Sequence, residues 1–338
     1  MMRVGLTYDL KSDYLAMGVS MEDAAEFDKE DTIDGIENAL RELGYEPDRI
    51  GHAKALVKRL EAGDRWDIVF NICEGLHGIA REAQVPAILD LYDVPYVFSD
   101  PLVLALTLHK GMTKSVVRDA GVPTSDFCVY ENAEDLQSLR FGAPFFVKPV
   151  AEGTGKGCSS KSIVRDRAAL AGVCDELVAR FHQPALIEPY LAGREFTVGI
   201  TGTGRAAKVV ASMEIVLLAN AEKGVYSYDN KGQYEDRVVY RPCDPSGDPV
   251  AAAAERVALD AWRALGCRDG GRVDVRCDAD QSPMFLEVNP LAGLNPKDSD
   301  LPILARMVNL SYTQLIGRIM DSAVTRVGEN AQRSTFNA

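Results

Sequence analysis

The stretch from Gly271 to Asn289 limits the fold of this chain most, because it predicts two short strands joined by a polar turn. Apolar and polar residues alternate in both strands, and a period of two sends them to opposite faces of a sheet. The chain is therefore expected to contain a sheet with one polar face. The residues predicted on that face are Arg272, Asp274, Arg276, Glu287 and Asn289, and those on the opposite face are Val273, Val275, Leu286 and Val288.

A turn at Asp280-Gln281 places Asp274 opposite Glu287 and Arg272 opposite Asn289. Two carboxylates that face each other repel unless a positive charge lies between them. Oxygen ligands of this kind suit a hard divalent cation, most often Mg²⁺ that carries nucleotide phosphates. Acids on both strands are also common on solvated sheet faces. The hairpin alone therefore leaves two interpretations open, a metal site and a solvated surface.

The composition is that of a globular protein. A length of 338 residues predicts two or three domains, and the net charge of −13 argues against general nucleic-acid binding, which needs a basic surface. No apolar run approaches the ~20 residues of a membrane span, and the first residues predict a strand rather than a signal peptide. The seven cysteines are scattered and form no Cys-x-x-Cys pair. This usage indicates reduced thiols in a cytoplasmic protein.

Residues 1–100 alternate strand-like and helix-like patterns, which predicts a parallel sheet with helices on its faces. One helix is predicted from Asp31, as its N-cap, to Gly44, as its C-terminal stop. Parallel sheets bind ligands at the carboxyl ends of their strands, so Asp9 and the loop that ends in His77 lie at a potential site. An ordinary loop histidine explains His77 equally well. The predicted strands are 3–7, 66–72 and 95–98, and a second helix is predicted over 82–92.

The segment over residues 11–30 is unusually acidic. A solvated loop or helix face is one interpretation. An acidic wall that recognises the ammonium group of a substrate is the other. Its acidic residues are Asp13, Glu22, Asp23, Glu26, Asp28 and Glu30.

An apolar strand that ends in Lys148 runs into a glycine-rich loop. Glycines let backbone N–H groups approach phosphate oxygens, and Thr154 and Lys156 add donors. The loop is not a Walker A motif, because Gly157 replaces the required serine or threonine and a predicted strand, 160–164, follows instead of a helix. A hairpin that closes over a nucleotide and a flexible hairpin tip both fit the loop. A lysine at the end of an apolar strand, however, needs a partner. The glycines of the loop are Gly153, Gly155 and Gly157.

Residues 184–196 predict a strand and a tight turn that carry Glu188 and Glu195. Carboxylates accept hydrogen bonds from amino and hydroxyl groups, so the two suit the base and the ribose of a nucleotide. Two surface carboxylates are the alternative. The tyrosine-rich segment 221–237 is either a functional flap or disorder, and its tyrosines favour the flap. Helices are predicted over 249–265 and 301–324, and the tail after Val327 is predicted to be disordered.

The order of these features resembles that of the ATP-grasp superfamily of carboxylate–amine ligases. Over nearly its whole length the chain resembles the D-alanine–D-alanine ligase family within it. The most specific motifs are Val147-Lys-Pro-Val-Ala-Glu-Gly-Thr-Gly-Lys-Gly-Cys-Ser, Glu188-Pro-Tyr-Leu-Ala-Gly-Arg-Glu, and Gly271-Arg-Val-Asp-Val with Leu286-Glu-Val-Asn. The resemblance implies an α/β protein with an N-terminal parallel-sheet domain (1–100) and a two-part α+β ATP-grasp fold. The two parts are a central subdomain with the phosphate loop (101–192) and a C-terminal subdomain with the metal hairpin and the flap (193–330).

The resemblance also implies a set of site residues, with ATP and two Mg²⁺ ions, or Mn²⁺ in their place, as cofactors. Lys110, Lys148, Glu152, Gly153, Gly155 and Lys156 would hold the phosphates, and Glu188, Leu191 and Glu195 would contact adenine and ribose. Asp274, Glu287 and Asn289 would bind the metal ions. Arg272 and the Gly293 backbone would hold the oxyanion, Thr154 would replace the serine of the phosphate loop, and Lys231 of the flap would approach the γ-phosphate. Contacts to the amino-acid substrates would come from Asp9, His77, Tyr228, Tyr234 and Ser299.

The implied reaction is ligation of two small amino acids in a homodimeric enzyme. ATP phosphorylates the first carboxylate to an acyl phosphate, the second amine attacks it, and D-alanyl-D-alanine is the expected product. The differences from the family pattern fall on the amino-acid pocket. The first loop, Thr7-Tyr-Asp-Leu-Lys-Ser-Asp13, lacks the family's glutamate for the first ammonium, and Ile79-Ala-Arg-Glu-Ala-Gln84 replaces its Gly-Glu-Asp-Gly run. A ligase for another dipeptide or amide, with a larger or more cationic first substrate, is one alternative. A nucleotide-binding regulator without catalysis is another.

Overall fold

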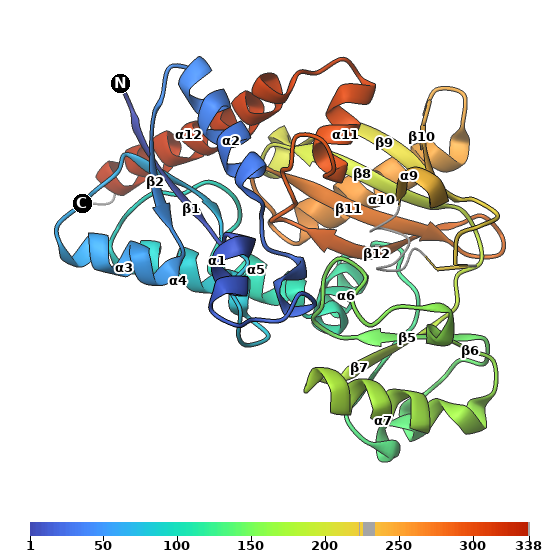
Figure 1. The fold of residues 1–338 in the computed structure, drawn as a ribbon. Helices are drawn as coiled ribbons and strands as arrows, with labels where there is room; N and C mark the ends of the chain where they lie inside the picture. The colour runs from blue at the N-terminus through green and yellow to red at the C-terminus, as the bar shows by residue number, and fades with distance from the viewer. Residues whose placement is uncertain (223, 226–233, 337–338) are drawn as a thin grey trace.

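The structure is a computed structural model that describes residues 1–222, 224–225 and 234–336. In this part of the chain the strands form three sheets, one in each of the three predicted stretches (Figure 1). The first sheet is parallel, and the other two are antiparallel. The predicted class, an α/β chain whose N-terminal parallel sheet precedes a two-part α+β fold, is confirmed.

The N-terminal sheet has the order β2-β1-β3. The prediction missed β2, an edge strand in which only Ile50 is buried, so its sequence shows no apolar alternation. The strand predicted over 95–98 is wrong, because only Tyr96 bridges to Val69. The elements are β1 (Arg3–Tyr8), α1 (Lys11–Ala16), η1 (Asp23–Ala25), α2 (Glu30–Glu42), β2 (Glu46–Gly51), α3 (Ala53–Glu61), β3 (Ile68–Ile72), η2 (Arg81–Ala83) and α4 (Gln84–Leu91), where η marks a short 3-10 helix.

Helix α2 buries one stripe of side chains at intervals of three and four residues. It ends before Gly44, whose φ of +84° suits the predicted glycine stop. Its predicted start is wrong, because Lys29 is the N-cap. Asp31 lies within the first turn, where its carboxylate accepts a hydrogen bond from Asn295 Nδ2 at 2.9 Å. An acid is favourable both as a cap and in the first turn, so the sequence does not distinguish the two positions.

The central sheet has the order β4-β7-β5-β6, and α7 packs against β5 and β7 (Figure 1). The strand predicted over 160–164 is wrong in extent. Ser159 accepts a hydrogen bond from the N–H of Lys161 at 3.2 Å and begins a 3-10 helix, which leaves two residues for β6. The elements are α5 (Pro101–Leu108), α6 (Lys110–Asp119), β4 (Cys128–Tyr130), η3 (Ala133–Ser138), β5 (Phe145–Pro149), η4 (Ser160–Ser162), β6 (Ile163–Val164), η5 (Arg167–Ala169), α7 (Leu170–Phe181) and β7 (Ala185–Pro189).

The C-terminal sheet has the order β10-β9-β8-β11-β12. Helix α10 begins at the Asp248 cap and packs Trp262 against the β11 side of one face. Helix α11 covers the opposite face, where Leu304 lies against Gly199. The elements are β8 (Glu195–Thr201), η6 (Gly204–Ala206), β9 (Lys208–Leu217), α9 (Tyr234–Arg237), β10 (Val238–Pro242), α10 (Pro249–Ala264), β11 (Gly270–Cys277), β12 (Pro283–Asn289), α11 (Asp300–Met307) and α12 (Tyr312–Phe336).

Strands β11 and β12 pair in the predicted register, with Asp274 opposite Glu287 and Arg272 opposite Asn289. Below this point Val275 pairs with Phe285, so Leu286 is the extra residue of a β-bulge. The bulge reverses the alternation, and Phe285 takes the core position predicted for Leu286. The prediction that Leu286 shares the apolar face with Val288 is therefore wrong, because strict alternation was assumed.

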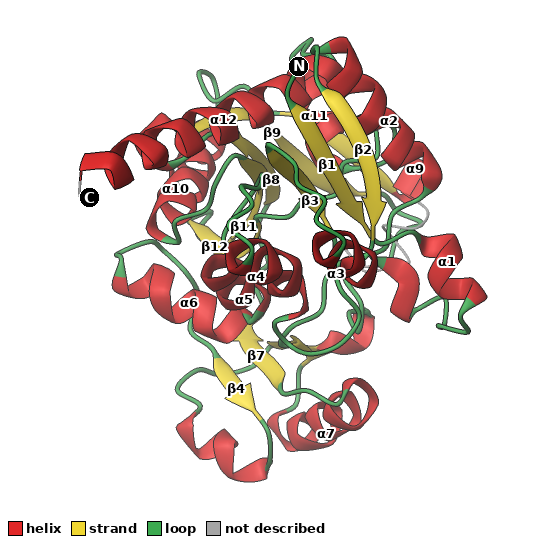
Figure 2. Ribbon diagram, turned by 90° about the vertical axis from the view of Figure 1, so that its left-hand side faces the viewer, coloured by secondary structure: helices red, strands yellow, loops and turns green. Residues whose placement is uncertain are grey.

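The last helix, α12, packs against α2, so one hydrophobic core joins the N-terminal sheet to residues 291–323 (Figures 1 and 2). The third predicted stretch is therefore not packed independently of the first. The disorder predicted after Val327 is wrong for residues 328–336, because helix α12 continues to Phe336, and residues 337–338 lie outside the described part of the chain. No proline interrupts the sequence there, so the helix can continue. None of the helices in the described residues combines the length and the apolarity needed to cross a bilayer.

Candidate active site

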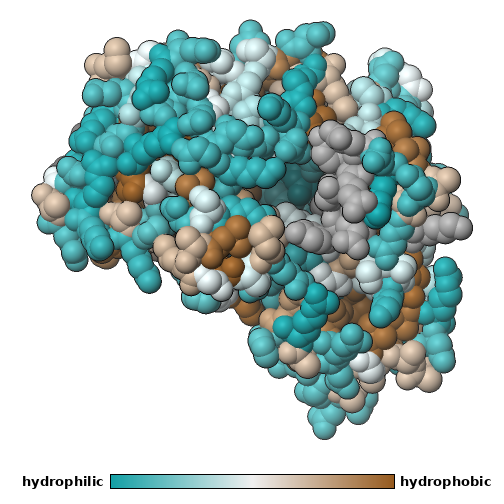
Figure 3. All heavy atoms as spheres, viewed as in Figure 1, coloured by the Kyte–Doolittle hydropathy of each residue, from teal (hydrophilic) through white to brown (hydrophobic). Residues whose placement is uncertain are grey.

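Two adjoining cavities lie between the N-terminal loops, the phosphate loop and the β11-β12 hairpin. The surface is hollowed and hydrophilic between the N-terminal and C-terminal parts (Figure 3). Lys110, Glu152 and Glu287 line both cavities, so the two spaces meet at these side chains. The lysine cavity is further lined by Lys148, Gly155, Lys156, Glu188, Leu191, Glu195, Asp274, Arg276 and Leu286. The carboxylate cavity is further lined by Glu26, Glu74, Glu82, Gly153, Thr154, Arg272, Asn289 and Gly293.

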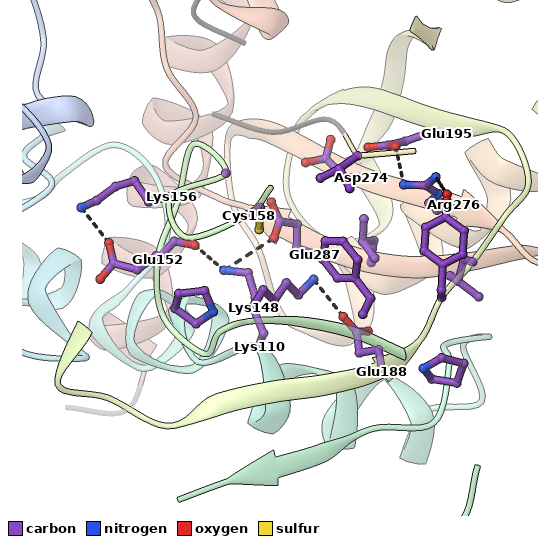
Figure 4. A pocket seen from close by; sticks show the side chains of 18 residues that line it. Lys110, Lys148, Glu152, Lys156, Cys158, Glu188, Glu195, Asp274, Arg276 and Glu287 are labelled. Carbon is purple, nitrogen blue, oxygen red and sulfur yellow. Dashed lines mark hydrogen bonds and ion pairs between the residues drawn. The ribbon is translucent and has the colours of Figure 1, made fainter. Parts of the chain in front are cut away.

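Glu188 of the lysine cavity lies between two lysines, and Figure 4 shows its contact with one of them, Lys148. Strand β7 places its carboxylate 2.9 Å from Lys148 of the adjacent β5, and α6 brings Lys114 to 2.7 Å from the other oxygen. Burial by itself raises the pKa of Glu188, but the two lysines lower it to about 2. Burial likewise lowers the pKa of Lys148, but Glu188 and Glu287 raise it above its ordinary value. Glu188 and Lys148 are therefore charged at neutral pH, whereas burial lowers the pKa of Lys114 in spite of the attraction of Glu188.

Lys110 joins the phosphate loop to the hairpin. Its ammonium donates to the carbonyl oxygen of Glu152 at 2.5 Å and lies 3.5 Å from a carboxylate oxygen of Glu287 (Figure 4). Within the loop, Lys156 pairs with the Glu152 carboxylate at 2.7 Å. Gly157 has a φ of +74°, and a side chain there would meet Pro149 at 2.6 Å. The glycine lets the loop fold back over its own strand and keep its lysine inside the cavity.

The other wall of the lysine cavity carries Glu195 and Arg276, which form an ion pair at 3.0 Å (Figure 4). The Arg276 guanidinium also lies 5.3 Å from the centre of the Tyr190 ring and donates to the carbonyl oxygen of Gly224 at 3.2 Å. This wall combines a carboxylate and a cation with the apolar side chains of Leu191 and Leu286. A flat ring with a hydroxylated substituent fits a wall of this composition.

The hairpin presents oxygen donors beside Arg272. Arg272 pairs with Asp274, and its Nε lies 3.6 Å from Asp300. Thr197 donates to the second oxygen of Asp274 at 2.8 Å. The Asn289 Nδ2 atom is buried without a hydrogen-bond partner among the described residues, as expected of a side chain that serves a ligand. The described residues contain no cluster of three or more His, Cys, Asp or Glu side chains arranged as a metal site. Two carboxylates and an amide, completed by phosphate oxygens, are nevertheless a suitable donor set for Mg²⁺.

A clamp of Glu26, just after η1, and Arg81, at the start of η2, fastens the phosphate loop to the N-terminal part of the chain. The two side chains form a buried ion pair at 2.8 Å. Arg81 also donates to the carbonyl oxygen of Ala151 at 3.0 Å, and the N–H of Gly153 donates to Glu26 at 2.8 Å. Burial raises the pKa of Glu26, but Arg81 outweighs it and holds the pKa below its ordinary value. A side chain at Gly153 would lie 2.7 Å from the Glu26 carboxylate, so only glycine permits this approach.

Glu74 and Glu82 line the carboxylate cavity without an ion pair or hydrogen bond from any described side chain. They come from two turns in direct contact, since a Cβ at Gly75 would lie 2.7 Å from the Arg81 carbonyl oxygen. Burial raises the pKa of Glu82 to about 7, and it raises the pKa of Glu74 well above its ordinary value, to which Glu82 and Glu26 add. Arg81 opposes both shifts but is held by Glu26.

Three of the predicted substrate residues do not line either cavity. Asp9 is buried and accepts hydrogen bonds from Tyr14 at 2.6 Å and from the N–H of Gly75 at 2.8 Å, so it holds the loop that carries Glu74. His77 is exposed. Ser299 lies beside the cavity, where its Oγ accepts from the N–H of Asn295 at 2.9 Å. The predictions for Tyr228 and Lys231 fall outside the described residues, as does the side chain of Tyr234.

Several side chains of the site have no assigned role in the sequence prediction. Arg276 shares the polar face of β11 with Asp274, so the period of two placed it correctly without indicating its partner. Lys114 stands four residues after Lys110, one helical turn along α6. Arg81 and Glu82 belong to the run that departs from the family pattern. That departure was the only sequence signal for them.

Comparison with known proteins agrees with this architecture. The family model described as D-ala D-ala ligase C-terminus matches residues 116–321. The D-alanine–D-alanine ligase of Bordetella petrii is 32% identical over 307 residues, which are 89% of each chain. That of Bordetella pertussis is 33% identical over 304 residues, 88% of this chain and 91% of the relative. A crystal structure of the Bacillus anthracis D-alanine–D-alanine ligase complexed with ATP has a TM-score of 0.72 at 22% identity, and the match covers 98% of this chain and 100% of that one.

Proposed function

The chain belongs to the D-alanine–D-alanine ligase family, and we propose that it is an ATP-dependent ligase that forms D-alanyl-D-alanine. One observation supports this function most directly. Lys110, Glu152 and Glu287 line both cavities, so a phosphate held in the lysine cavity lies against a carboxylate held in the other. Transfer of a phosphoryl group to that carboxylate requires positioning and charge neutralisation, which such a border provides.

ATP would occupy the lysine cavity. Lys110, Lys148 and the loop over Gly153, Gly155 and Lys156 would hold its phosphates, and Glu152 would keep Lys156 in place through their ion pair. Adenine would lie against Leu191 and the Glu188 strand, and the ribose would meet Glu195. Glu195 is bound to Arg276, so the ribose hydroxyls would share or replace that ion pair.

Asp274, Glu287 and Asn289 would hold Mg²⁺, with Mn²⁺ as a substitute. The bound metal ions would neutralise the charge that accumulates on the transferred phosphoryl oxygens. On the protein side, Arg272 and Lys110 already neutralise Asp274 and Glu287, so these basic groups would turn toward the substrate when the phosphates arrive.

The acyl transfer would take place in the carboxylate cavity. A carboxylate oxygen of the first amino acid attacks the γ-phosphorus, and ADP leaves. The amine of the second amino acid, after losing a proton, then attacks the acyl carbon, and inorganic phosphate leaves. Arg272 and the Gly293 backbone would stabilise the tetrahedral oxyanion. Thr154 Oγ1, which is buried without a partner among the described residues, would hydrogen-bond to a substrate. The roles predicted for Lys231, Tyr228 and Tyr234 remain predictions.

The assembly is proposed to be a cytoplasmic homodimer. The dimer is what the family resemblance implies, exposed apolar side chains on α4, α5 and α6 are available for an interface, and all seven cysteines are free, as in a reducing compartment. Sedimentation velocity measures the oligomeric state directly, and a monomer at micromolar concentration would contradict the dimer. The exposed side chains are Leu91, Leu102, Met112 and Val116.

Phosphate release from ATP with D-alanine tests the ligase, and detection of the dipeptide by mass spectrometry confirms the product. Glu287→Gln is expected to lower turnover at least about 100-fold, because it removes a metal ligand at the border of the cavities. Glu176→Gln, on the exposed surface of α7, is the matched control and should keep full activity. Unchanged circular dichroism would show that the Glu287 variant is folded. Full turnover by that variant would contradict the metal assignment.

A further inference from the structure

Glu74 and Glu82 are the unbalanced charges of the carboxylate cavity. Glu26, Glu74, Glu82, Glu152 and Glu287 line it, against one lysine and one arginine. The positive groups are already engaged, because Lys110 pairs with Glu287 and Arg272 pairs with Asp274. Lys156 neutralises Glu152 from the neighbouring cavity.

The cation nearest to the two carboxylates is not available to them. Arg81 lies next to Glu82 in the chain, yet its guanidinium is directed to Glu26 at 2.8 Å and to the Ala151 carbonyl at 3.0 Å. This clamp fastens the phosphate loop, and Arg81 cannot turn to Glu74 or Glu82 without releasing it. Glu74 and Glu82 are partly withdrawn from water, and a carboxylate in such a place without a basic partner is unfavourable. The missing positive charge has to come with the ligand or as a proton.

Two further groups indicate that a polar ligand fills this space. Thr154 Oγ1 and Asn289 Nδ2 line the same cavity and are buried without a hydrogen-bond partner among the described residues. Buried polar atoms of this kind are normally satisfied, so their partners are expected on the ligand. They stand on the phosphate-loop side and the hairpin side, whereas Glu74 and Glu82 stand on the N-terminal side. The cavity is therefore polar on one side and acidic on the other.

On the basis of the proposed function, we propose that the first substrate site prefers an amino acid with a second ammonium group, a short diamino carboxylic acid. Its carboxylate points to Lys110 and the transferred phosphate, and its two ammonium groups meet Glu74 and Glu82. D-Alanine is accepted in the same place but supplies one ammonium for two carboxylates. Asp9 is buried beneath the Gly75 turn and Glu26 is paired with Arg81, which leaves Glu74 and Glu82 as the N-terminal acids of this cavity without a basic partner among the described residues.

The test compares diamino acids with neutral amino acids of the same shape, each offered with ATP, Mg²⁺ and D-alanine as the second substrate. The pairs are 2,3-diaminopropionate with 2-aminobutyrate, 2,4-diaminobutyrate with norvaline, and ornithine with norleucine, in both enantiomers. Phosphate release gives kcat/KM, and mass spectrometry identifies the dipeptide. At least one diamino acid should exceed its neutral counterpart at least about tenfold, as a charge-assisted contact implies.

Glu82→Gln, which removes one charge at constant size, should bring that ratio to within about threefold of one. Glu61→Gln, an exposed change of the same charge on α3, should leave the ratio unchanged. Calorimetric titration of the diamino acid into the ATP-free protein gives a readout apart from turnover, and its affinity should fall in the Glu82 variant. Equal or better use of the neutral acids would overturn the diamino preference and leave the ligase standing. Absence of phosphate release with every amino acid would overturn both.

Discussion

Lys114 offers the sharpest test of the electrostatics of this site, because its ammonium is fully buried and lines neither cavity. It lies 2.7 Å from Glu188 and 2.7 Å from the hydroxyl of Thr124, to which it donates. Lys114→Met keeps most of the aliphatic stem and removes the charge. Any effect on nucleotide binding must then pass through the partners of Lys114, and among its side-chain partners Glu188 is the one that lines the lysine cavity.

The magnitude follows from the pKa of Glu188. Burial raises this pKa, but Lys114 and Lys148 bring it from 4.5 to about 2. This decrease corresponds to roughly 3 kcal/mol in favour of the ionised form, at about 1.4 kcal/mol per pKa unit. Loss of one partner of a buried ion pair costs about 3–5 kcal/mol. Because Lys148 stays at 2.9 Å, we expect Lys114→Met to lower the free energy of unfolding by about 3 kcal/mol.

Urea unfolding followed by circular dichroism measures this loss in the wild type, Lys114→Met, Glu188→Gln and the double variant. The double variant should lose at least about 1 kcal/mol less than the sum of the single variants, because the two side chains share one interaction. Lys54→Met, an exposed change on α3, is the control and should stay within about 0.5 kcal/mol of the wild type. Additive losses, or a loss below about 1 kcal/mol in Lys114→Met, would refute the assignment of Lys114 as a buried counter-charge.

Two further predictions concern the turns around the carboxylate cavity. Gly75→Ala should destabilise the protein by about 2 kcal/mol more than Gly63→Ala. Both glycines have a positive φ, but only at Gly75 would a Cβ atom meet backbone, 2.7 Å from the carbonyl oxygen of Arg81. Equal shifts in Tm would contradict this packing. Burial raises the pKa of Glu82 from 4.5 to about 7, so between these pH values the folded state binds a proton that the unfolded state does not. The contribution of Glu82 to the free energy of unfolding should therefore rise as the pH falls from 7 to 4.5. The difference in Tm between the wild type and Glu82→Gln, measured across this range, should shrink toward low pH, and a difference independent of pH would exclude the shift.

Much of the lysine cavity could be predicted, because each of its residues follows from a local pattern. The alternation in β11 placed Asp274 and Arg272 on one face, and their predicted pairing with Glu287 and Asn289 is observed. The lysine at the end of β5 is recognisable because an apolar strand rarely ends in a buried charge without function. What this reasoning misses is the extra residue at Leu286. A bulge depends on how the strand fits its neighbours and has no fixed signal in one strand's own sequence.

The carboxylate cavity was harder to predict, because its residues are distant in the sequence and stand on turns. Glu26 reaches Gly153 across 127 positions, and Arg81 reaches Ala151 across 70. Acidic residues on loops are usually solvated, so the acidity of residues 11–30 could not single out Glu26. Asp9 stands at the end of a parallel strand, where a ligand contact is expected, yet it holds the Gly75 turn instead. Only the folded structure distinguishes a residue that lines a site from one that supports it.

The two cavities differ in how their charges are balanced, and this difference constrains the ligands more than the shapes do. In the lysine cavity Glu188 has two basic partners. Lys110 and Lys156 each pair with a carboxylate, and bound phosphates can replace those carboxylates as partners of the two lysines. An anionic nucleotide is complementary to that arrangement. At the carboxylate cavity Arg81, which is next to Glu82 in the chain, is used to fasten the phosphate loop, and Glu74 and Glu82 have no basic partner among the described residues. Arg81 fastens the phosphate loop and, for the same reason, does not pair with Glu74 or Glu82. A mutation of Arg81 is therefore expected to change both nucleotide binding and substrate choice. A mutation of Glu74 should change substrate choice alone.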